Sequence, residues 1–373
     1  MIECEPARGC KAAVYAGRMI GSHLSIAGSM VNALKEAEAL GFDSVQVFTK
    51  NQQQWSAPAL KSEAIEAWLA ELGRLGWRSG NRATPRIVSH ASYLANLASP
   101  DETLRIKSAG LIRDELARCE LLEIPLLVMH PGAFTTSALE EGMTRIAKAV
   151  AGLLNEPPAA GSKVRPVLCL ENVAGQGSTV GRNFEELAEL RRLIVKTGGQ
   201  GISGRVGFCI DTCHMHAAGY DLSTHAKAEA AIAELDRVCG LENVRCLHVN
   251  DSKAECGSRV DRHAHIGAGT IGLASFAAFM NHAGLRGRPM IMETQKGDDD
   301  SGRPWDLVNA ERLRSVMVGA KPATPKAIGQ GVPRTKPSQK RVRPPVAKVT
   351  KKSVCRPRGR AVGGQAVKAK PRV

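Results

Sequence analysis

The sequence has few aromatic side chains and no long apolar run. Only 4% of its 373 residues are Phe, Trp or Tyr, although 43% are hydrophobic, so a folded core must be mainly aliphatic. No stretch reaches the roughly 18 consecutive apolar residues that indicate a transmembrane helix. We therefore exclude a membrane-spanning protein and expect no membrane partner.

Acidic residues are missing from the C-terminal end of the chain. Residues 321–373 contain 16 Lys and Arg and eight Pro, but no Asp, Glu, Leu or aromatic residue. This segment holds the excess that gives the chain its formal net charge of +15. Because such a composition cannot bury enough apolar surface to fold, we predict a disordered Lys/Arg/Pro-rich tail over 319–373. Cations without anions favour contact between this tail and the DNA backbone.

A secretion signal and a disulfide framework are also lacking. The first residues place acids ahead of a short apolar stretch, which is a poor signal peptide, and residues 1–18 read as a disordered leader. The ten cysteines are scattered over a long chain, which indicates reduced thiols. We expect a cytoplasmic protein, associated with the nucleoid if the source is bacterial.

Between leader and tail, short apolar runs alternate eight times with helical patterns such as SEAIEAWLAELGRLG. Eight strand–helix units in about 300 residues are typical of a (β/α)8 TIM barrel, an α/β fold that we predict over 19–318. An open, doubly wound sheet gives the same local pattern, but the count of eight favours closure. The predicted strands are Met19–Ser22, Ser44–Phe48, Arg86–Ser89, Leu126–Met129, Pro166–Leu170, Val206–Ile210, Val244–Leu247 and Pro289–Met292.

Six consecutive predicted strands end in a histidine or a carboxylate. In a parallel barrel all strand C-termini open on one face, so these residues should converge. Five histidines and four carboxylates exceed what an acid/base pair needs, and zinc, manganese and iron prefer such ligands. Four carboxylates packed together without a metal would repel one another. The candidate metal ligands are His90, His130, Glu171, Asp211, His214, His248, Asp261, His263 and Glu293.

Other residues have simpler interpretations. A single His or Asp at a strand end is more often a structural residue or a helix cap, and we expect His216 and His265 to be peripheral. The segment Gly267–Gly272 fits G-x-G-x-x-G, but it does not follow a clear strand in an N-terminal βαβ unit. We expect it to be a loop entering a helix near Leu273, with no nucleotide cofactor.

Longer motifs surround the candidate ligands. They are HLSIAGSM (His23–Met30), FTKNQQQW (Phe48–Trp55), HASYLANL (His90–Leu97), LENVAGQGSTVG (Leu170–Gly181), CIDTCHMHAAGYDL (Cys209–Leu222) and HVNDSKAECGSRVDRHAHIGAGTIG (His248–Gly272). These motifs resemble the endonuclease IV family of apurinic/apyrimidinic (AP) endonucleases, and the resemblance spans about residues 19–318.

The resemblance implies a barrel with three Zn²⁺ per chain, which Mn²⁺ or Fe could replace in part. It implies cleavage of duplex DNA 5′ to an abasic site in base-excision repair, leaving a 3′-hydroxyl and a 5′-deoxyribose phosphate, together with 3′-end cleaning. Glu171 would bridge two metals and help to orient the attacking water. The implied ligand sets are His90, His130 and Glu171; Glu171, Asp211, His248 and Glu293; and His214, Asp261 and His263.

The same resemblance implies that Gln53, Gln54 and Tyr93 lie on loops that enter the minor groove and open the lesion. Gln53 stands where relatives carry Arg, so we expect weaker penetration of the base stack. Ala91 replaces an acidic residue that is common after the first ligand histidine, which would loosen the support of that ligand.

Two other classes of protein remain as alternatives. A metal-dependent TIM-barrel sugar isomerase or epimerase needs only one or two divalent metals, so His214, Asp261 and His263 would have no obvious use there. An architectural DNA-binding protein with an inactive barrel should have lost ligands, whereas this ligand set is complete.

Overall fold

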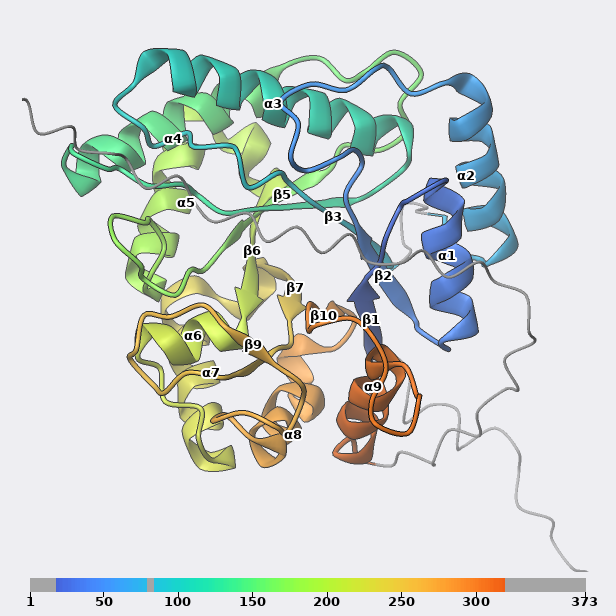
Figure 1. Cartoon of the computed structure of the whole chain (residues 1–373). Coiled ribbons are helices and arrows are strands. Elements are labelled where there is room, and N and C mark those ends of the chain that lie inside the picture. The colour runs from blue at the N-terminus through green and yellow to red at the C-terminus, as the bar shows by residue number, and fades with distance from the viewer. Residues whose placement is uncertain (1–17, 79–83, 319–373) are drawn as a thin grey trace, which may run out of the picture. The chain divides into compact units, whose positions relative to one another are not determined.

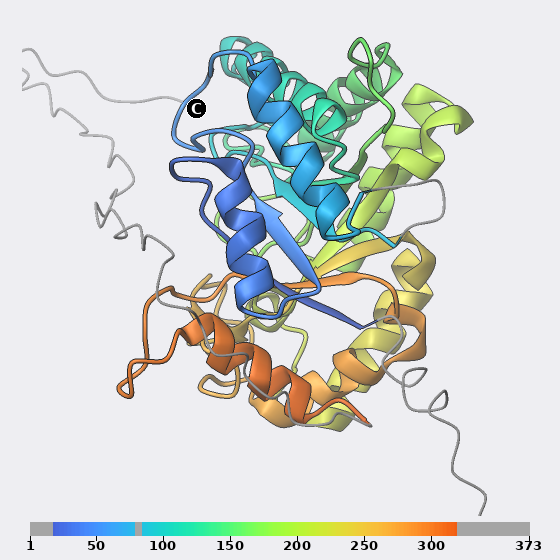
Figure 2. The ribbon, with the colours of Figure 1, turned by 90° about the vertical axis from the view of Figure 1, so that its right-hand side faces the viewer.

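The computed structural model describes residues 18–78 and 84–318. The predicted tail and the predicted leader, apart from Arg18, lie outside the described residues. Within the described residues the strands are wrapped by helices, as two perpendicular views show (Figures 1 and 2).

Eight parallel strands close into a barrel in the order β1-β10-β7-β6-β5-β4-β3-β2, which confirms the predicted TIM barrel. Each predicted strand agrees with an observed one to within one residue at either end. The strands are β1 Met19–His23, β2 Ser44–Val47, β3 Ile87–His90, β4 Leu126–Met129, β5 Val167–Glu171, β6 Val206–Asp211, β7 Val244–His248 and β10 Pro289–Met292.

Helices follow the barrel strands and cover the outside of the barrel (Figure 1). Eight helices of the described residues lie where the sequence shows helical patterns: α1 Met30–Ala39, α2 Ser62–Arg74, α3 Glu102–Leu121, α4 Leu139–Asn155, α5 Phe184–Gly198, α7 His225–Cys239, α8 Leu273–Asn281 and α9 Trp305–Ser315. Several begin at polar caps: the side chains of Asp101, Asn183 and Thr224 accept backbone N–H groups of the first turns of α3, α5 and α7.

The barrel interior is filled with small aliphatic and cysteine side chains. Val128, Cys169, Cys209, Cys246 and Ile291 belong to one buried cluster, separate from the larger core. Cys209, two residues before Asp211 on β6, thus lies in the barrel interior. Burial raises the pKa of the Cys209 thiol, so it packs as a neutral group rather than serving as a thiolate.

Short elements absent from the sequence prediction lie at the C-terminal ends of the strands. Helix α6 (Thr212–Ala218) starts directly after β6, and strands β8 (Asp251–Ser252) and β9 (His263–Ala264) form an antiparallel pair after β7. At the other end of the barrel, 3-10 turns over Gln200–Arg205, Leu241–Asn243 and Ala283–Leu285 precede β6, β7 and β10. Among the described residues, no helix combines the length and apolar character needed to cross a membrane.

Candidate metal centre

The ends of the barrel strands bring the nine predicted ligands to one face, here called the mouth. Four of them are the last residues of strands: His90 of β3, Glu171 of β5, Asp211 of β6 and His248 of β7. Two directly follow strands: His130 follows β4, and Glu293 follows β10. The remaining three are His214 on α6, His263 on β9 and Asp261 in the loop before β9.

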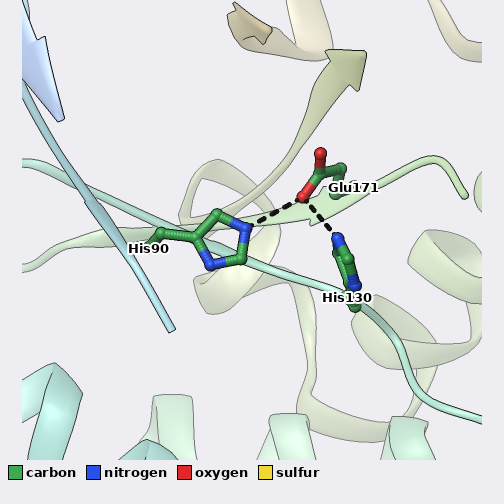
Figure 3. A group of neighbouring side chains, drawn as sticks. All are labelled: His90, His130 and Glu171. Carbon is green, nitrogen blue, oxygen red and sulfur yellow. Dashed lines mark hydrogen bonds and ion pairs between the residues drawn. The ribbon is translucent and has the colours of Figure 1, made fainter. Parts of the chain in front are cut away.

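The first group contains His90, His130 and Glu171, whose side chains point toward one another (Figure 3). The Nε2 atoms of His90 and His130 lie 3.1 and 3.0 Å from the same oxygen, Glu171 Oε2. The Nδ1 of His90 donates to the Ala91 carbonyl (2.7 Å), which leaves its Nε2 free to bind a ligand. Ala91 therefore supports this ligand through its backbone, whatever its side chain.

The second group centres on His248. Its Nδ1 lies 2.8 Å from Glu171 Oε1, 3.2 Å from Glu293 Oε2 and 3.9 Å from Asp211 Oδ2. Its Nε2 donates to Gln46 Oε1 (2.8 Å), so Nδ1 is the nitrogen that faces the three carboxylates and that would bind a metal. The Gln46 amide in turn donates to Glu293 Oε1 (2.6 Å).

Sequence reasoning missed Gln46. It lies fully buried in β2, and a polar residue within a buried strand is the signal that could have identified it.

In the third group, Asp261 joins two histidines. His214 Nε2 lies 3.2 Å from Asp261 Oδ2, and His263 Nε2 lies 3.3 Å from Asp261 Oδ1. The Nδ1 atoms of the two rings donate to the carbonyls of Asn172 (2.9 Å) and Glu293 (3.2 Å), so both Nε2 atoms are free to bind a ligand. The buried Nε2 of His263 has no hydrogen-bond partner.

This donor chemistry fits divalent metal ions. Four histidines turn one nitrogen inward and fix the other with a hydrogen bond, as zinc-binding histidines do. Despite burial, the carboxylates raise the pKa of His214 and His248 to about 10. The facing histidines hold the pKa values of Glu171 and Asp261 below the ordinary range, although burial opposes this. The acids are therefore ionised, and either protonated histidines or a bound cation balances their charge.

The loop that carries Asp261 is attached to the end of α6. The backbone N–H groups of Gly257 and Arg259 donate to the carbonyls of His216 (3.0 Å) and Ala217 (2.9 Å). Arg259 adopts a left-handed conformation with φ of 55°, which turns the chain toward the mouth. These contacts explain how Asp261 reaches His214, which stands on the same helix.

The amides of the G-x-G-x-x-G segment surround a carboxylate of the protein itself. Asp251 is fully buried and accepts the backbone N–H groups of Gly267, Gly269, Ile271 and Gly272 at 2.9 to 3.3 Å. Such a set of amides can bind a phosphate, but here an internal anion occupies it. As predicted, the segment is a loop that enters α8 at Leu273.

His216 belongs to a further group of potential ligands, with Asp221 and Cys256. Its Nδ1, however, accepts the N–H of Leu222 (3.2 Å), which places the ring proton on Nε2. Asp221 is paired with Lys227 (2.7 Å). Because His216 Nδ1 and the Asp221 carboxylate already have these partners, this group does not offer three free ligand atoms to a metal. His265 stacks on Trp305, with ring centroids 3.8 Å apart.

The predicted DNA-contacting residues also lie at the mouth. Tyr93 is 55% exposed, and its ring centroid lies 5.1 Å from that of His90 and 5.4 Å from that of His130. Gln53 and Gln54 are exposed on the loop after β2. Two exposed apolar residues also lie here: Trp55 is on the loop after β2, and Val260 is next to Asp261 in the sequence.

Comparison with known proteins gives the same fold and a specific family. A family model described as a xylose isomerase-like TIM barrel matches residues 34–315. A probable endonuclease 4 from Chloroflexus aurantiacus is 43% identical over 300 residues, which cover 80% of this chain and 98% of that protein. The crystal structure of endonuclease IV from Thermus thermophilus superimposes with a TM-score of 0.64 and 36% identity, covering 80% of this chain and 98% of the other.

Sugar epimerases share the architecture at much lower identity. A D-tagatose 3-epimerase-like protein is 18% identical with a TM-score of 0.57 and covers 80% of this chain and 96% of that protein, a likeness in fold alone. The identity and coverage of the endonuclease relatives distinguish the two groups. The chain therefore belongs to the endonuclease IV family.

Proposed function

We propose that this protein is a zinc-dependent AP endonuclease of base-excision repair. It hydrolyses the phosphodiester 5′ to an abasic site in duplex DNA, leaves a 3′-hydroxyl and a 5′-deoxyribose phosphate, and also removes blocked 3′ ends. The observation that carries this proposal is the junction of three ligand groups at one mouth: Glu171 faces two of them, and Asp211 lies between the second and the third.

Three divalent ions fit these groups. Zinc suits the mixture of imidazole and carboxylate donors, and manganese or iron could occupy some positions. Such ions generate a nucleophile from water at neutral pH and stabilise charge on phosphoryl oxygens. The proposed ligand sets are His90, His130 and Glu171; Glu171, Asp211, His248 and Glu293; and His214, Asp261 and His263.

Glu171 is the central residue of this arrangement. Its Oε2 faces His90 and His130, whereas its Oε1 faces His248, so one fully buried carboxylate bridges two groups. An anion in this position can hold an attacking water in line with the phosphorus. The exposed phenol of Tyr93 stands among the carboxylates of the mouth, which hold its pKa above the usual value, so it keeps a proton that it can donate to a phosphate oxygen.

The surface around the mouth suits a damaged duplex. We propose that Gln53, Gln54 and Tyr93 enter the minor groove, together with the exposed ring of Trp55. An abasic nucleotide has already lost its pairing, so its extrusion into the mouth is inexpensive. The exposed Arg259 and the tail over 319–373 contribute cations for the DNA backbone.

Cleavage of a duplex with one abasic site, with and without a chelator, tests the proposal. We expect a cut on the 5′ side that is lost on chelation and restored by zinc. Glu171→Ala should abolish cleavage but leave tail-driven DNA binding, whereas Glu229→Ala, at an exposed position of α7, should behave as wild type. An uncut abasic duplex, or full activity of Glu171→Ala, would refute the assignment.

A further inference from the structure

Lys50 lies in the loop that we propose to enter DNA, yet it is not on the surface. It is only 5% exposed, whereas the neighbouring Asn51, Gln53 and Gln54 are exposed. Its Nζ donates to the Gln54 carbonyl (2.8 Å) and lies 3.4 Å from Glu115 Oε1. A lysine held in this way cannot reach a phosphate, so its charge serves another purpose.

Glu115 connects Lys50 to the second DNA-facing loop. It is 2% exposed on α3, and both of its oxygens accept the backbone N–H of Ser92 (3.2 Å each). The Ser92 hydroxyl donates to the Gln52 carbonyl (2.5 Å) and thus returns to the first loop. These contacts form a network, here called the Lys50–Glu115 network, which joins the Gln53–Gln54 loop to the segment that carries Tyr93.

The base of the first loop is anchored separately. Arg118, nearly one turn after Glu115 on α3, donates to the carbonyls of Thr49 (3.3 Å) and Pro58 (2.6 Å). Arg118 therefore fixes where the loop starts and ends. Lys50 and Ser92 hold the carbonyls near its tip, at Gln54 and Gln52, and leave the side chains of Gln53 and Gln54 exposed.

We propose that Lys50 and Glu115 are positioning residues that fix the Gln53–Gln54 loop and the Tyr93 loop relative to each other before DNA binds. This inference rests on the proposed function, because it assumes that both loops contact DNA. A loop that is already ordered loses less conformational freedom on binding. The Lys50–Glu115 network therefore increases the affinity for the lesion and does not change the rate of the chemical step. Removal of one member leaves the other charge buried without its partner.

The test uses the full metal-loaded chain and a duplex with one abasic site. We expect Lys50→Met and Glu115→Gln each to raise Kd and KM by about tenfold or more, with kcat within about twofold of wild type. Lys50→Arg, which keeps a cation in place, should restore most of the affinity. Lys107→Ala is the matched control, because Lys107 is an exposed lysine on the same helix as Glu115.

Salt dependence separates positioning from a direct phosphate contact. Lys50→Met should leave the slope of log Kd against log salt unchanged, whereas loss of a phosphate contact lowers it by about one. A lower slope, or a fall in kcat at unchanged Kd, would overturn the inference. If wild type itself fails to cut the abasic duplex, the proposed function fails instead.

A double variant controls for loss of folding. Lys50→Met with Glu115→Leu replaces the ion pair with apolar side chains, an exchange that is often neutral for stability. We expect its Tm to fall less than that of either single variant, because no charge is left buried without its partner. Its Kd should stay raised, because the N–H of Ser92 and the carbonyl of Gln54 have lost their partners. Lys50→Arg, which keeps the charge, gives a second comparison if the double variant does not fold. Wild-type affinity in the double variant, or no gain in affinity for Lys50→Arg over Lys50→Met, would contradict the inference.

Discussion

Asp251→Asn should be strongly destabilising, although Asp251 is not among the proposed metal ligands. The buried carboxylate accepts five backbone N–H groups, those of Ser252, Gly267, Gly269, Ile271 and Gly272. It therefore folds the segment after His263 back onto the barrel. An asparagine keeps one acceptor oxygen but turns an NH₂ group toward at least two of these donors.

The size of the effect follows from those donors. A buried N–H without a partner costs about 1–3 kcal/mol. The N–H groups of Ser252 and Ile271 are buried and those of the three glycines are partly exposed, so two lost partners cost at most about 2–6 kcal/mol. That is a large share of the roughly 5–15 kcal/mol by which a typical protein is stable. With an m value of about 3 kcal/mol/M, the urea midpoint should fall by about 1–2 M.

Urea unfolding followed by circular dichroism measures this directly. Asp300→Asn, at an exposed position, is the matched control and should leave the midpoint unchanged. Because the same segment follows the strand of His263, Asp251→Asn should also weaken metal binding at His214, Asp261 and His263. A midpoint within about 0.3 M of wild type would show that the amides do not depend on the Asp251 carboxylate, against the reasoning from buried donors.

Three further predictions concern the mouth and the tail. Gln46→Leu removes the acceptor of His248 Nε2–H and the donor to Glu293, so metal affinity should fall about 10–100-fold in chelator competition; unchanged affinity would contradict the role of Gln46. Arg259→Ala should weaken binding to abasic DNA and lower the salt slope by about one, and an unaltered slope would exclude a phosphate contact. Deletion of 321–373 should flatten the salt dependence of DNA affinity and leave kcat almost unchanged; an unchanged slope would count against a DNA-binding tail.

The barrel and the convergence of the nine candidate ligands could be predicted from sequence because both depend on local patterns. Each strand is a short buried run, and most of the ligands stand at or next to its C-terminal end, as Glu171 and His248 do. Closure brings such ends together whatever their separation along the chain. Helix α6 was missed because its seven residues are too few for a helical period, and Asp211 serves both as strand end and as N-cap.

The supporting contacts could not be predicted, because they join residues without a common local pattern. Gln46 and His248 are separated by 202 positions and meet only in the closed barrel. Lys50 lies in the FTKNQQQW motif, but nothing in the motif indicates that it is buried against Glu115. The amides of Gly267 and Gly269 likewise match a phosphate-binding motif, but they bind Asp251.

We propose that nine side chains at the mouth bind three zinc ions. An anomalous difference map, measured at the zinc edge on crystals of the zinc-loaded protein, would locate these ions. We expect three peaks at the mouth, each about 2.0–2.2 Å from its ligand atoms, with Glu171 between two of them and Asp261 at the third. One peak, or a third peak away from His214, Asp261 and His263, would refute a three-zinc site.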